Sequence, residues 1–310
     1  MWWYRLVQVL LWLGTFALSV HAKNAHRRAI SSNLPPIPVP YNITKFSLAA
    51  ALVQQSYCDP ESYGPGLHVG DAELLQTIGD GDKRQRVLLY HSESLGIVVA
   101  YMGTNDSSLQ SSMNDFLFLP EPANDRYRHN MPGSVRLMHG FQQPYVDLVD
   151  DVQAAITQHK TERNESRVTV IGQSQGAAIG LLSAVDFHQR LDGGIYRAYL
   201  FGLPRLGNPV FANYVDKTIG DRLRWVVNGH DWVPNVPLRI AGYQHPSNYV
   251  WIFPANSSHW KLYPGQENIH GFASVPLDYF KSWDHEGVYF HTQVGTIRGR
   301  CPAVAGQDFQ

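Results

Sequence analysis

Short runs of apolar, β-branched and aromatic residues alternate along this chain with longer segments in which apolar residues recur at helical spacing. One stretch, 86–103, holds two such runs joined by a polar turn at 91–94, which predicts two strands. Further runs predict strands at 166–172, 195–205 and 222–229. Because the run at 166–172 is short and β-branched, we expect its strand to be buried on both faces.

Helices are predicted in three segments between or beside these runs. Residues 43–58 have helical apolar spacing and begin near a threonine cap at Thr44. Residues 135–160 lead into a single helix of about 20 residues, and residues 177–191 form another. The alternation of strand and helix predicts an α/β fold with a mainly parallel sheet that helices cover on both faces.

The N-terminal segment has the pattern of a secretory signal peptide at 1–22. Arg5 gives it a positive start, an apolar run interrupted by Gln8 follows at 6–20, and a small-residue cleavage position ends at Ala22. The alternative is a membrane anchor, but a span requires about 20 apolar residues and this run is shorter. Residues 23–40 are polar and proline-rich, which predicts an extended arm before one domain at 41–310.

The composition of the 310 residues argues against several classes of protein. Apolar residues make up 44% and charged residues 16%, which is typical of a packed globule rather than a disordered chain. The net charge of −1 provides no basic field to hold nucleic acid. The His, Cys and Asp residues lack zinc-ligand spacing, so we expect no metal and no organic cofactor. The sequence implies no stable protein partner, and we expect a monomer.

Secretion would place the two cysteines, Cys58 and Cys301, in an oxidising compartment. Two cysteines permit one intramolecular disulfide, which would close a loop of more than 240 residues. The alternative is two separate buried thiols.

Secretion also gives meaning to four glycosylation sequons, which begin at Asn42, Asn105, Asn164 and Asn256. Asn164 is favoured because it lies in the polar stretch "HKTERNESR". Asn42 and Asn256 remain candidates.

The segment "IGQSQGAAIG", 171–180, contains a Gly-x-Ser-x-Gly motif between a predicted strand and a predicted helix. This is the context that a nucleophile elbow requires, because the glycines permit a sharp turn that lifts the Ser174 hydroxyl clear of the sheet. The same turn aims the backbone N–H of Gln175 at developing negative charge. The alternative is an ordinary serine in a tight turn.

A serine nucleophile needs a base, and the base needs an acid that orients it, in the chain order Ser, Asp or Glu, His. Asp231 directly follows an apolar strand, whereas Asp216 and Asp221 precede that strand. Five histidines follow these acids: His245, His259, His270, His285 and His291. His285 lies on a late loop and is favoured, with His291 as its competitor. His245 is expected to be a structural hydrogen-bonding residue.

Residues from about 45 to 301 resemble the fungal class 3 lipases, a family that includes triacylglycerol lipases and related feruloyl esterases. The motifs that carry the resemblance share the family's order and spacing: "VVAYMGT" (98–104), "MHGF" (138–141), "VIGQSQGAAIG" (170–180), "FGLPRLGNPVFANYV" (201–215), "NGHDWVPNVP" (228–237), "GYQH" (242–245) and "WDHEGVYF" (283–290). The resemblance implies an α/β-hydrolase fold and a triad of Ser174, Asp231 and His285, with His285 chosen over His291 because a Tyr-Phe pair follows it.

The resemblance also implies an oxyanion hole from Thr104 and the N–H of Gln175, and it supports a Cys58–Cys301 disulfide. A glycan at Asn105, beside Thr104, would block such a site, so we expect Asn105 to be unmodified.

The chain departs from the family's usual pattern at the elbow, where Gln173 and Gln175 replace His and Leu around the serine. The usual Phe-Arg-Gly-Thr is here 101–104, Tyr-Met-Gly-Thr, and Glu286 replaces the common Leu after the histidine. These departures bear on pocket shape and substrate preference rather than on the chemistry. With Trp232 after the aspartate and Gln175 after the serine, the chain resembles the subgroup of the family that prefers mono- and diacylglycerols.

More than 30 residues separate Thr104 from the "MHGF" segment, which is too long for a plain connection. The segment 107–120 carries apolar residues on one helical face, followed by an apolar lip: Leu109, Met113, Phe116, Leu117, Phe118 and Leu119. The hypothesis is a lid at about 105–122 that covers the site in water and meets lipid when open. The alternative is an ordinary surface helix.

Together these patterns predict a secreted serine lipase that hydrolyses acylglycerol esters at an oil–water interface through an acyl-enzyme. Two alternatives stay open: a feruloyl or short-chain esterase on the same fold, and a lipid-binding relative without catalytic activity.

Overall fold

The computed structural model describes residues 31–104, 119–296 and 298–306, all in one structural unit that begins at Ser31. The predicted signal peptide, Asn105 and the predicted lid residues Leu109, Met113, Phe116, Leu117 and Phe118 lie outside the described residues. Among the described residues, no helix has the length and apolar character needed to cross a membrane.

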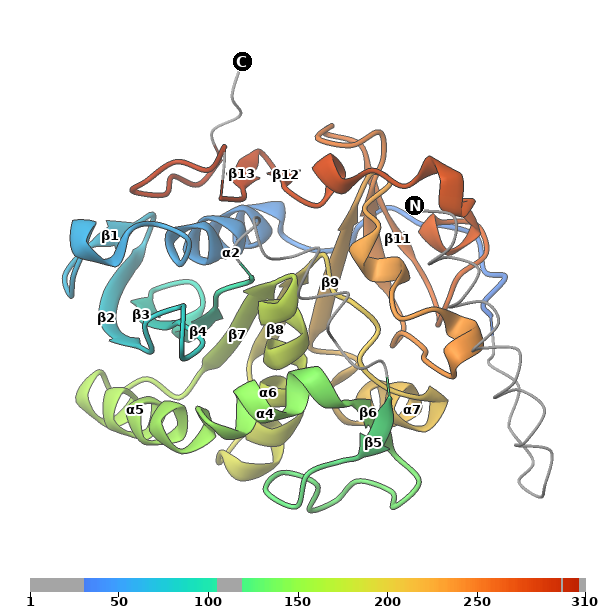
Figure 1. Ribbon diagram of the computed structural model, residues 1–310. Coiled ribbons are helices and arrows are strands. Elements are labelled where there is room, and N and C mark those ends of the chain that lie inside the picture. The colour runs from blue at the N-terminus through green and yellow to red at the C-terminus, as the bar shows by residue number, and fades with distance from the viewer. Residues whose placement is uncertain (1–30, 105–118, 297, 307–310) are drawn as a thin grey trace, which may run out of the picture. The chain divides into compact units, whose positions relative to one another are not determined.

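A nine-stranded sheet forms the centre of this unit, in the order β1-β2-β3-β4-β7-β8-β9-β10-β11 (Figure 1). Its strands are β1 (His68–Val69), β2 (Ala72–Ile78), β3 (Val87–Ser92), β4 (Gly96–Tyr101), β7 (Val168–Gln173), β8 (Arg197–Phe201), β9 (Leu223–Asn228), β10 (Tyr249–Ile252) and β11 (Trp260–Tyr263). Neighbouring strands from β4 to β10 are parallel, and the pairs outside this centre are antiparallel. The predicted parallel sheet is therefore confirmed for the centre, and antiparallel pairs extend it on both sides.

Two small sheets and the helices complete the fold. The small sheets pair β5 (Pro120–Pro122) with β6 (Arg136–Met138), and β12 (Gly287–Tyr289) with β13 (Thr292–Val294). The α-helices are α2 (Ile43–Gln55), α4 (His139–Val146), α5 (Val149–Glu162), α6 (Gln175–Arg190) and α7 (Pro209–Ile219). Short 3-10 helices are η1 (Pro60–Ser62), η2 (Val233–Asn235), η3 (Arg239–Ala241), η4 (Phe272–Ser274), η5 (Leu277–Tyr279) and η6 (Ser282–Asp284).

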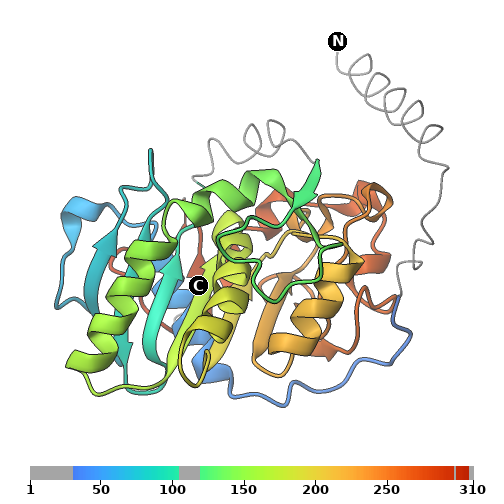
Figure 2. The same cartoon turned by 90° about the horizontal axis from the view of Figure 1, so that it is seen from below.

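Helices cover both faces of the sheet, as the alternating pattern predicts. Helices α4 to α7 lie on one face, and α2 lies on the other with β12 and β13 (Figures 1 and 2). Successive side chains of the central strands divide between two cores: Val170 packs on the α4–α7 side and Ile171 on the α2 side. Since every residue of β7 is buried, its β-branched sequence matches its place at the centre of the sheet.

Two predicted helix features are wrong in detail. The single helix expected within 135–160 is two helices, because the chain tightens after α4 so that the Leu148 N–H bonds to the Tyr145 carbonyl. Pro144 inside α4 disfavours one continuous helix. Two acidic residues in the first turn of α5 favour a new helix start there. The cap of α2 is Asn42 rather than Thr44, because Asn42 Oδ1 accepts the Thr44 N–H at 2.9 Å.

The described residues before α2, 31–42, form neither a helix nor a strand, and they pair with the edge of the sheet at one position. Ile37 and Leu262 of β11 exchange both backbone hydrogen bonds at 2.9 Å. This contact continues the sheet beyond β11 by one residue pair.

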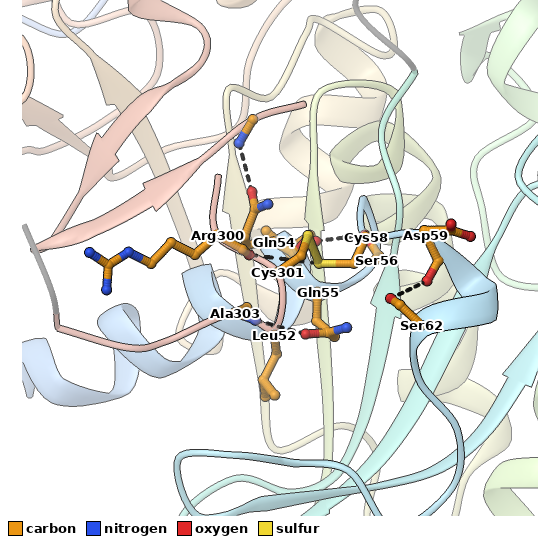
Figure 3. Close-up of a disulfide and its surroundings, with 12 residues drawn as sticks. Leu52, Gln54, Gln55, Ser56, Cys58, Asp59, Ser62, Arg300, Cys301 and Ala303 are labelled. Atoms are coloured by element: carbon orange, nitrogen blue, oxygen red, sulfur yellow. Dashed lines mark hydrogen bonds between the residues drawn. A yellow bond between two sulfur atoms is a disulfide. The ribbon is translucent and has the colours of Figure 1, made fainter. Parts of the chain in front are cut away.

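The two cysteines form one disulfide that joins the end of α2 to the C-terminal segment, with Cα atoms 5.5 Å apart (Figure 3). Two glutamines of α2 bond the same segment: the Gly295 N–H donates to Gln54 Oε1, and the Ala303 N–H donates to Gln55 Oε1, both at 2.8 Å. The predicted Cys58–Cys301 pairing is present, and it is reinforced by side-chain hydrogen bonds.

Candidate active site

The turn between β7 and α6 has the geometry of a nucleophile elbow. Strand β7 ends at Gln173, α6 begins at Gln175, and Ser174 between them has φ 58° and ψ −128°. The Ser174 N–H donates to the Phe201 carbonyl of β8 at 3.0 Å, which fixes the turn against the neighbouring strand. Positive φ is rare outside glycine, and where it occurs the surrounding structure must impose it.

The glycines on either side of Ser174 are required by close backbone approach. A Cβ on Gly172 would collide with the carbonyl of Gly176, and a Cβ on Gly176 would collide with the carbonyls of Tyr101 and Met102. The motif therefore allows α6 to approach both β7 and the end of β4. This approach brings the helix N-terminus to the loop that carries Thr104.

The predicted acid and base lie together beside this elbow. His285 Nδ1 is 2.8 Å from Asp231 Oδ2, and the two residues are 2% and 1% exposed. Asp231 follows β9 directly, and its second oxygen, Oδ1, accepts the Val233 N–H at 2.9 Å. One carboxylate oxygen is thus held by the backbone while the other faces the imidazole.

The other ring nitrogen of His285 faces the elbow. His285 Nε2 lies 3.1 Å from Nε2 of Gln173, the residue before Ser174. Ser174 is 2% exposed, and its Oγ makes no hydrogen bond to the described residues. The predicted base thus contacts the elbow through Gln173 in this state of the molecule.

The backbone of His285 is held as firmly as its ring. Its carbonyl accepts hydrogen bonds from Tyr289 Oη at 3.0 Å and from Gln173 Nε2 at 3.2 Å. Burial, with a smaller contribution from the charge of Asp231, raises the pKa of Tyr289 well above its usual value. Tyr289 therefore remains a hydrogen-bond donor to this carbonyl at any ordinary pH.

A buried ion pair supports the loop that follows Asp231. Arg205 and Glu267 form two hydrogen bonds, at 2.7 and 2.8 Å, and Arg205 also donates to the carbonyls of Asn235 and Pro237. Burial alone would raise the pKa of Glu267, but the bonds and charge of Arg205 outweigh it and lower the pKa to about 2. Glu267 thus stays ionised and fixes the arginine that braces the loop.

The two residues predicted for the oxyanion hole lie in contact. Thr104 Oγ1 donates to the side-chain Oε1 of Gln175 at 2.7 Å. Gln175 is the first residue of α6, so its backbone N–H has no acceptor within the helix. A pocket of about 710 Å³ opens beside both residues, but its walls include Asp80, Asp82 and Lys83, which makes it unsuited to an acyl chain.

The remaining predicted positions have simple surroundings. Trp232 is half-buried and packs against Val233. The sequon residues Asn42, Asn164 and Asn256 are exposed. Asn256 Oδ1 accepts the Val288 N–H at 2.7 Å, which ties its loop to the strand after His285.

The competing residues have structural partners elsewhere. His291 lies against the Trp260 ring, and Asp216 accepts the Ser247 N–H at 2.8 Å. His245 is 1% exposed, stacks on Trp225 and places Nε2 2.7 Å from the Pro234 carbonyl. In the described part of the chain, His, Cys, Asp and Glu side chains do not gather in groups of three or more that could hold a metal ion.

In the sequence, Gln173 is visible only as a departure from the family's pattern, and no motif marks Tyr57, Arg205 or Glu267. Tyr57 Oη donates to Gln173 Oε1, across 116 residues of sequence. The position of Gln173, directly before the serine, could have indicated a role for it. The other three lie far from their partners in sequence, and spacing alone gives no sign of them.

A turn with the geometry of a nucleophile elbow, a buried aspartate–histidine pair and a largely parallel sheet together define a hydrolase of the α/β class. The family described as Lipase (class 3) matches residues 98–240. Among known proteins, the secreted mono- and diacylglycerol lipase MDL4 of Malassezia globosa is 60% identical over 298 residues, which cover 96% of this chain and 97% of that protein. The chain belongs to the class 3 lipase family.

Two solved structures extend the comparison. The triacylglyceride lipase of Rhizomucor miehei is 26% identical, with a TM-score of 0.69, and the match covers 82% of this chain and 96% of that one. A triacylglycerol lipase whose catalytic centre is formed by a serine protease triad is also 26% identical, with a TM-score of 0.67 over 82% of this chain and 95% of that one.

Proposed function

We propose that this protein is a secreted serine lipase that hydrolyses the carboxylic esters of acylglycerols through an acyl-enzyme, with Ser174, Asp231 and His285 as its triad. The observation that carries the proposal is the buried Asp231–His285 hydrogen bond beside a strained elbow that presents Ser174. A carboxylate, an imidazole and a serine in this order are the components of acyl transfer.

In the proposed reaction, His285 Nε2 takes the proton from Ser174 Oγ as that oxygen attacks the ester carbonyl. Asp231 orients the ring and stabilises the imidazolium that forms. His285 then gives the proton to the leaving alcohol, and the acyl group stays on Ser174. Water, activated by the same histidine, releases the fatty acid and restores the hydroxyl.

The N-terminus of α6 supports the charge that develops in this reaction. The tetrahedral intermediate carries a negative oxygen, and we assign its stabilisation to Thr104 and the backbone N–H of Gln175. Each donor of this kind contributes roughly 3–4 kcal/mol to transition-state stabilisation. In this state the Thr104 hydroxyl donates its proton to the Gln175 side chain, so this bond must break before the hydroxyl can donate to the oxygen.

The substrate class rests on the relatives. MDL4 is a secreted mono- and diacylglycerol lipase, and at 60% identity over nearly the whole chain its substrates are the best guide to those of this protein. The same comparison supports secretion, which agrees with the signal-peptide pattern and the disulfide. Because Ser174, Asp231 and His285 are all almost fully buried, neighbouring groups must move before a lipid reaches them.

Hydrolysis assays with mono-, di- and triacylglycerols beside a feruloyl ester test the proposal. We expect the unsubstituted protein, called the parent below, to cleave mono- and diacylglycerols. The Ser174→Ala variant should have a kcat lower by about 10⁴-fold or more and a melting temperature near that of the parent. A fluorophosphonate should label the parent at Ser174 and leave the variant unlabelled.

The outcomes separate the alternatives. Preferential cleavage of the feruloyl ester would show that the protein is a feruloyl esterase rather than a lipase. A parent that is folded, binds lipid and neither hydrolyses these esters nor reacts with the fluorophosphonate would be a lipid-binding relative, and the proposal would be wrong.

A further inference from the structure

The side chain of Gln173 makes three hydrogen bonds at the centre of the proposed site, although it is the residue before the nucleophile. Its Nε2 lies 3.1 Å from the ring Nε2 of His285 and 3.2 Å from the carbonyl oxygen of the same histidine. Its Oε1 accepts the hydroxyl of Tyr57. Gln173 is 2% exposed, so water does not compete for these bonds.

The partners of the amide fix which way it points. A backbone carbonyl can only accept, so the amino group of Gln173 must face His285, and the amide oxygen faces Tyr57. The second hydrogen of that amino group then points at His285 Nε2. This nitrogen must accept, so it carries no proton, and the ring proton lies on Nδ1 toward Asp231.

This is the tautomer that a general base requires, because Nε2 then carries an electron pair, which can take the serine proton once the Gln173 amide releases it. We propose that Gln173 is a positioning residue for His285: its amide holds the ring in the reactive tautomer and against the elbow, and Tyr57 holds the amide. The inference rests on the proposed function, and it extends that function by two residues outside the triad.

The same two residues contact the oxyanion side of the site. A Cβ on Gly103 would collide with Tyr57 Oη and would lie 2.8 Å from the Gln173 carbonyl oxygen, so the loop before Thr104 packs directly on this pair. Tyr57 itself stands next to Cys58, whose disulfide anchors the end of α2. The Tyr57–Gln173 pair thus lies between the loop that carries Thr104 and the proposed base.

The bond to the ring is specific to the resting enzyme. Nε2 must release the Gln173 N–H before it can take the proton of Ser174, and the amino group of Gln173 then keeps only its bond to the His285 carbonyl. That remaining bond, with the bond from Tyr289, holds the histidine backbone in place through the proton transfer. Gln173 does not touch the ester, so its removal should lower kcat and leave KM nearly unchanged.

The test uses variants that remove the donor but keep the size of the side chain. Gln173→Met and Gln173→Glu both lack the amide N–H, and Tyr57→Phe removes the group that orients it. The readouts are kcat and KM for a soluble short-chain ester and the rate constant for labelling of Ser174 by a fluorophosphonate. We expect both Gln173 variants to lose about tenfold or more in kcat and in labelling rate, with KM within about twofold, and Tyr57→Phe to lose about threefold.

The chain offers a matched control, because another tyrosine–glutamine pair, which is buried, lies elsewhere in the molecule. Tyr127 Oη donates to Gln142 Oε1 at 2.5 Å, and this pair does not contact His285. Gln142→Met and Tyr127→Phe should lower the melting temperature but leave kcat and the labelling rate at the parent value. They separate a role in positioning the base from a general loss of stability.

Three results would overturn the inference. The first is parent-like kcat and labelling in Gln173→Met and Gln173→Glu, and the second is an equal loss in Gln142→Met. The third is a loss that appears only in KM. If Gln173→Met does not fold, Tyr57→Phe makes the same test with a milder change. If the fluorophosphonate does not label Ser174 in the parent, the proposed function itself is wrong. The Gln173 and Tyr57 variants test only the positioning role, so the two failures can be told apart.

Discussion

Ser174 has a backbone conformation that L-residues seldom adopt, and its hydroxyl lacks a hydrogen-bond partner among the described residues. Both features cost free energy, about 1–3 kcal/mol for the backbone alone. The N–H bond to Phe201 and the two flanking glycines impose the turn. At the scale of single residues, strain and unsatisfied bonding thus coincide at the proposed nucleophile, as expected where a side chain is held ready for reaction.

His245 gives a prediction at the same scale. Burial, aided by the charge of Arg205, lowers its pKa from 6.5 to about 3. Between these values the unfolded chain binds a proton that the folded protein excludes, so stability falls as the pH falls through this window, by up to about 1.4 kcal/mol per pH unit. We expect His245→Phe, which keeps an aromatic ring on Trp225, to show a shallower decline of melting temperature between pH 6.5 and pH 4.

Thermal melts across this pH range measure the effect. The exposed His259 provides the control, and His259→Phe should keep the slope of the parent. An unchanged slope in His245→Phe would show that another group sets the acid sensitivity.

At the scale of elements, the sequence predicted the strands and helices that surround the elbow but not how every helix is divided. The β-branched run at 168–171 predicted a buried strand, and β7 is buried throughout. The break between α4 and α5 depends on one tightened hydrogen bond at Leu148, which helical spacing does not reveal because both halves bury the same face against the sheet. The antiparallel flanks likewise depend on hairpin pairing, which strand–helix alternation does not report.

The cap of α2 provides a test in which two substitutions can be compared. Asn42→Ala and Thr44→Ala both destroy the sequon, but only the first removes the Oδ1 that accepts the Thr44 N–H. We expect Asn42→Ala to lower the free energy of unfolding by about 1 kcal/mol relative to Thr44→Ala, measured by urea denaturation. Equal stabilities would mean that the cap contributes nothing, whether or not a glycan is attached.

At the scale of the whole molecule, the disulfide could be predicted because the chain has only two cysteines, and the candidate triad could be proposed because chain order and the family's motifs restrict it. The Tyr57–Gln173–His285 contacts could not, because each joins residues more than 100 positions apart and depends on side-chain directions. The Arg205–Glu267 pair, 62 positions apart, was missed because it also depends on side-chain directions. Sequence motifs thus indicated the proposed reacting groups, and only the structure identified the residues that contact them.

The Cys58–Cys301 bond is the longest-range covalent constraint described, with 243 residues of separation. A cross-link over such a loop stabilises by up to about 5 kcal/mol in the chain-entropy treatment. We expect the double variant Cys58→Ala, Cys301→Ala to unfold at a lower denaturant concentration, with a loss of several kcal/mol. The Gln54 and Gln55 bonds keep the C-terminal segment docked, so the fold itself should persist. An unchanged midpoint would contradict the prediction.

The pairing of Ile37 with Leu262 has a consequence for how molecules meet one another. Open sheet edges are templates for intermolecular strand addition, which leads to aggregates. Here the N-terminal arm occupies part of the β11 edge, and the opposite edge ends in β1, a strand of two residues. Within the described part of the chain, both borders of the sheet are thus partly covered, which should limit strand addition from a second copy.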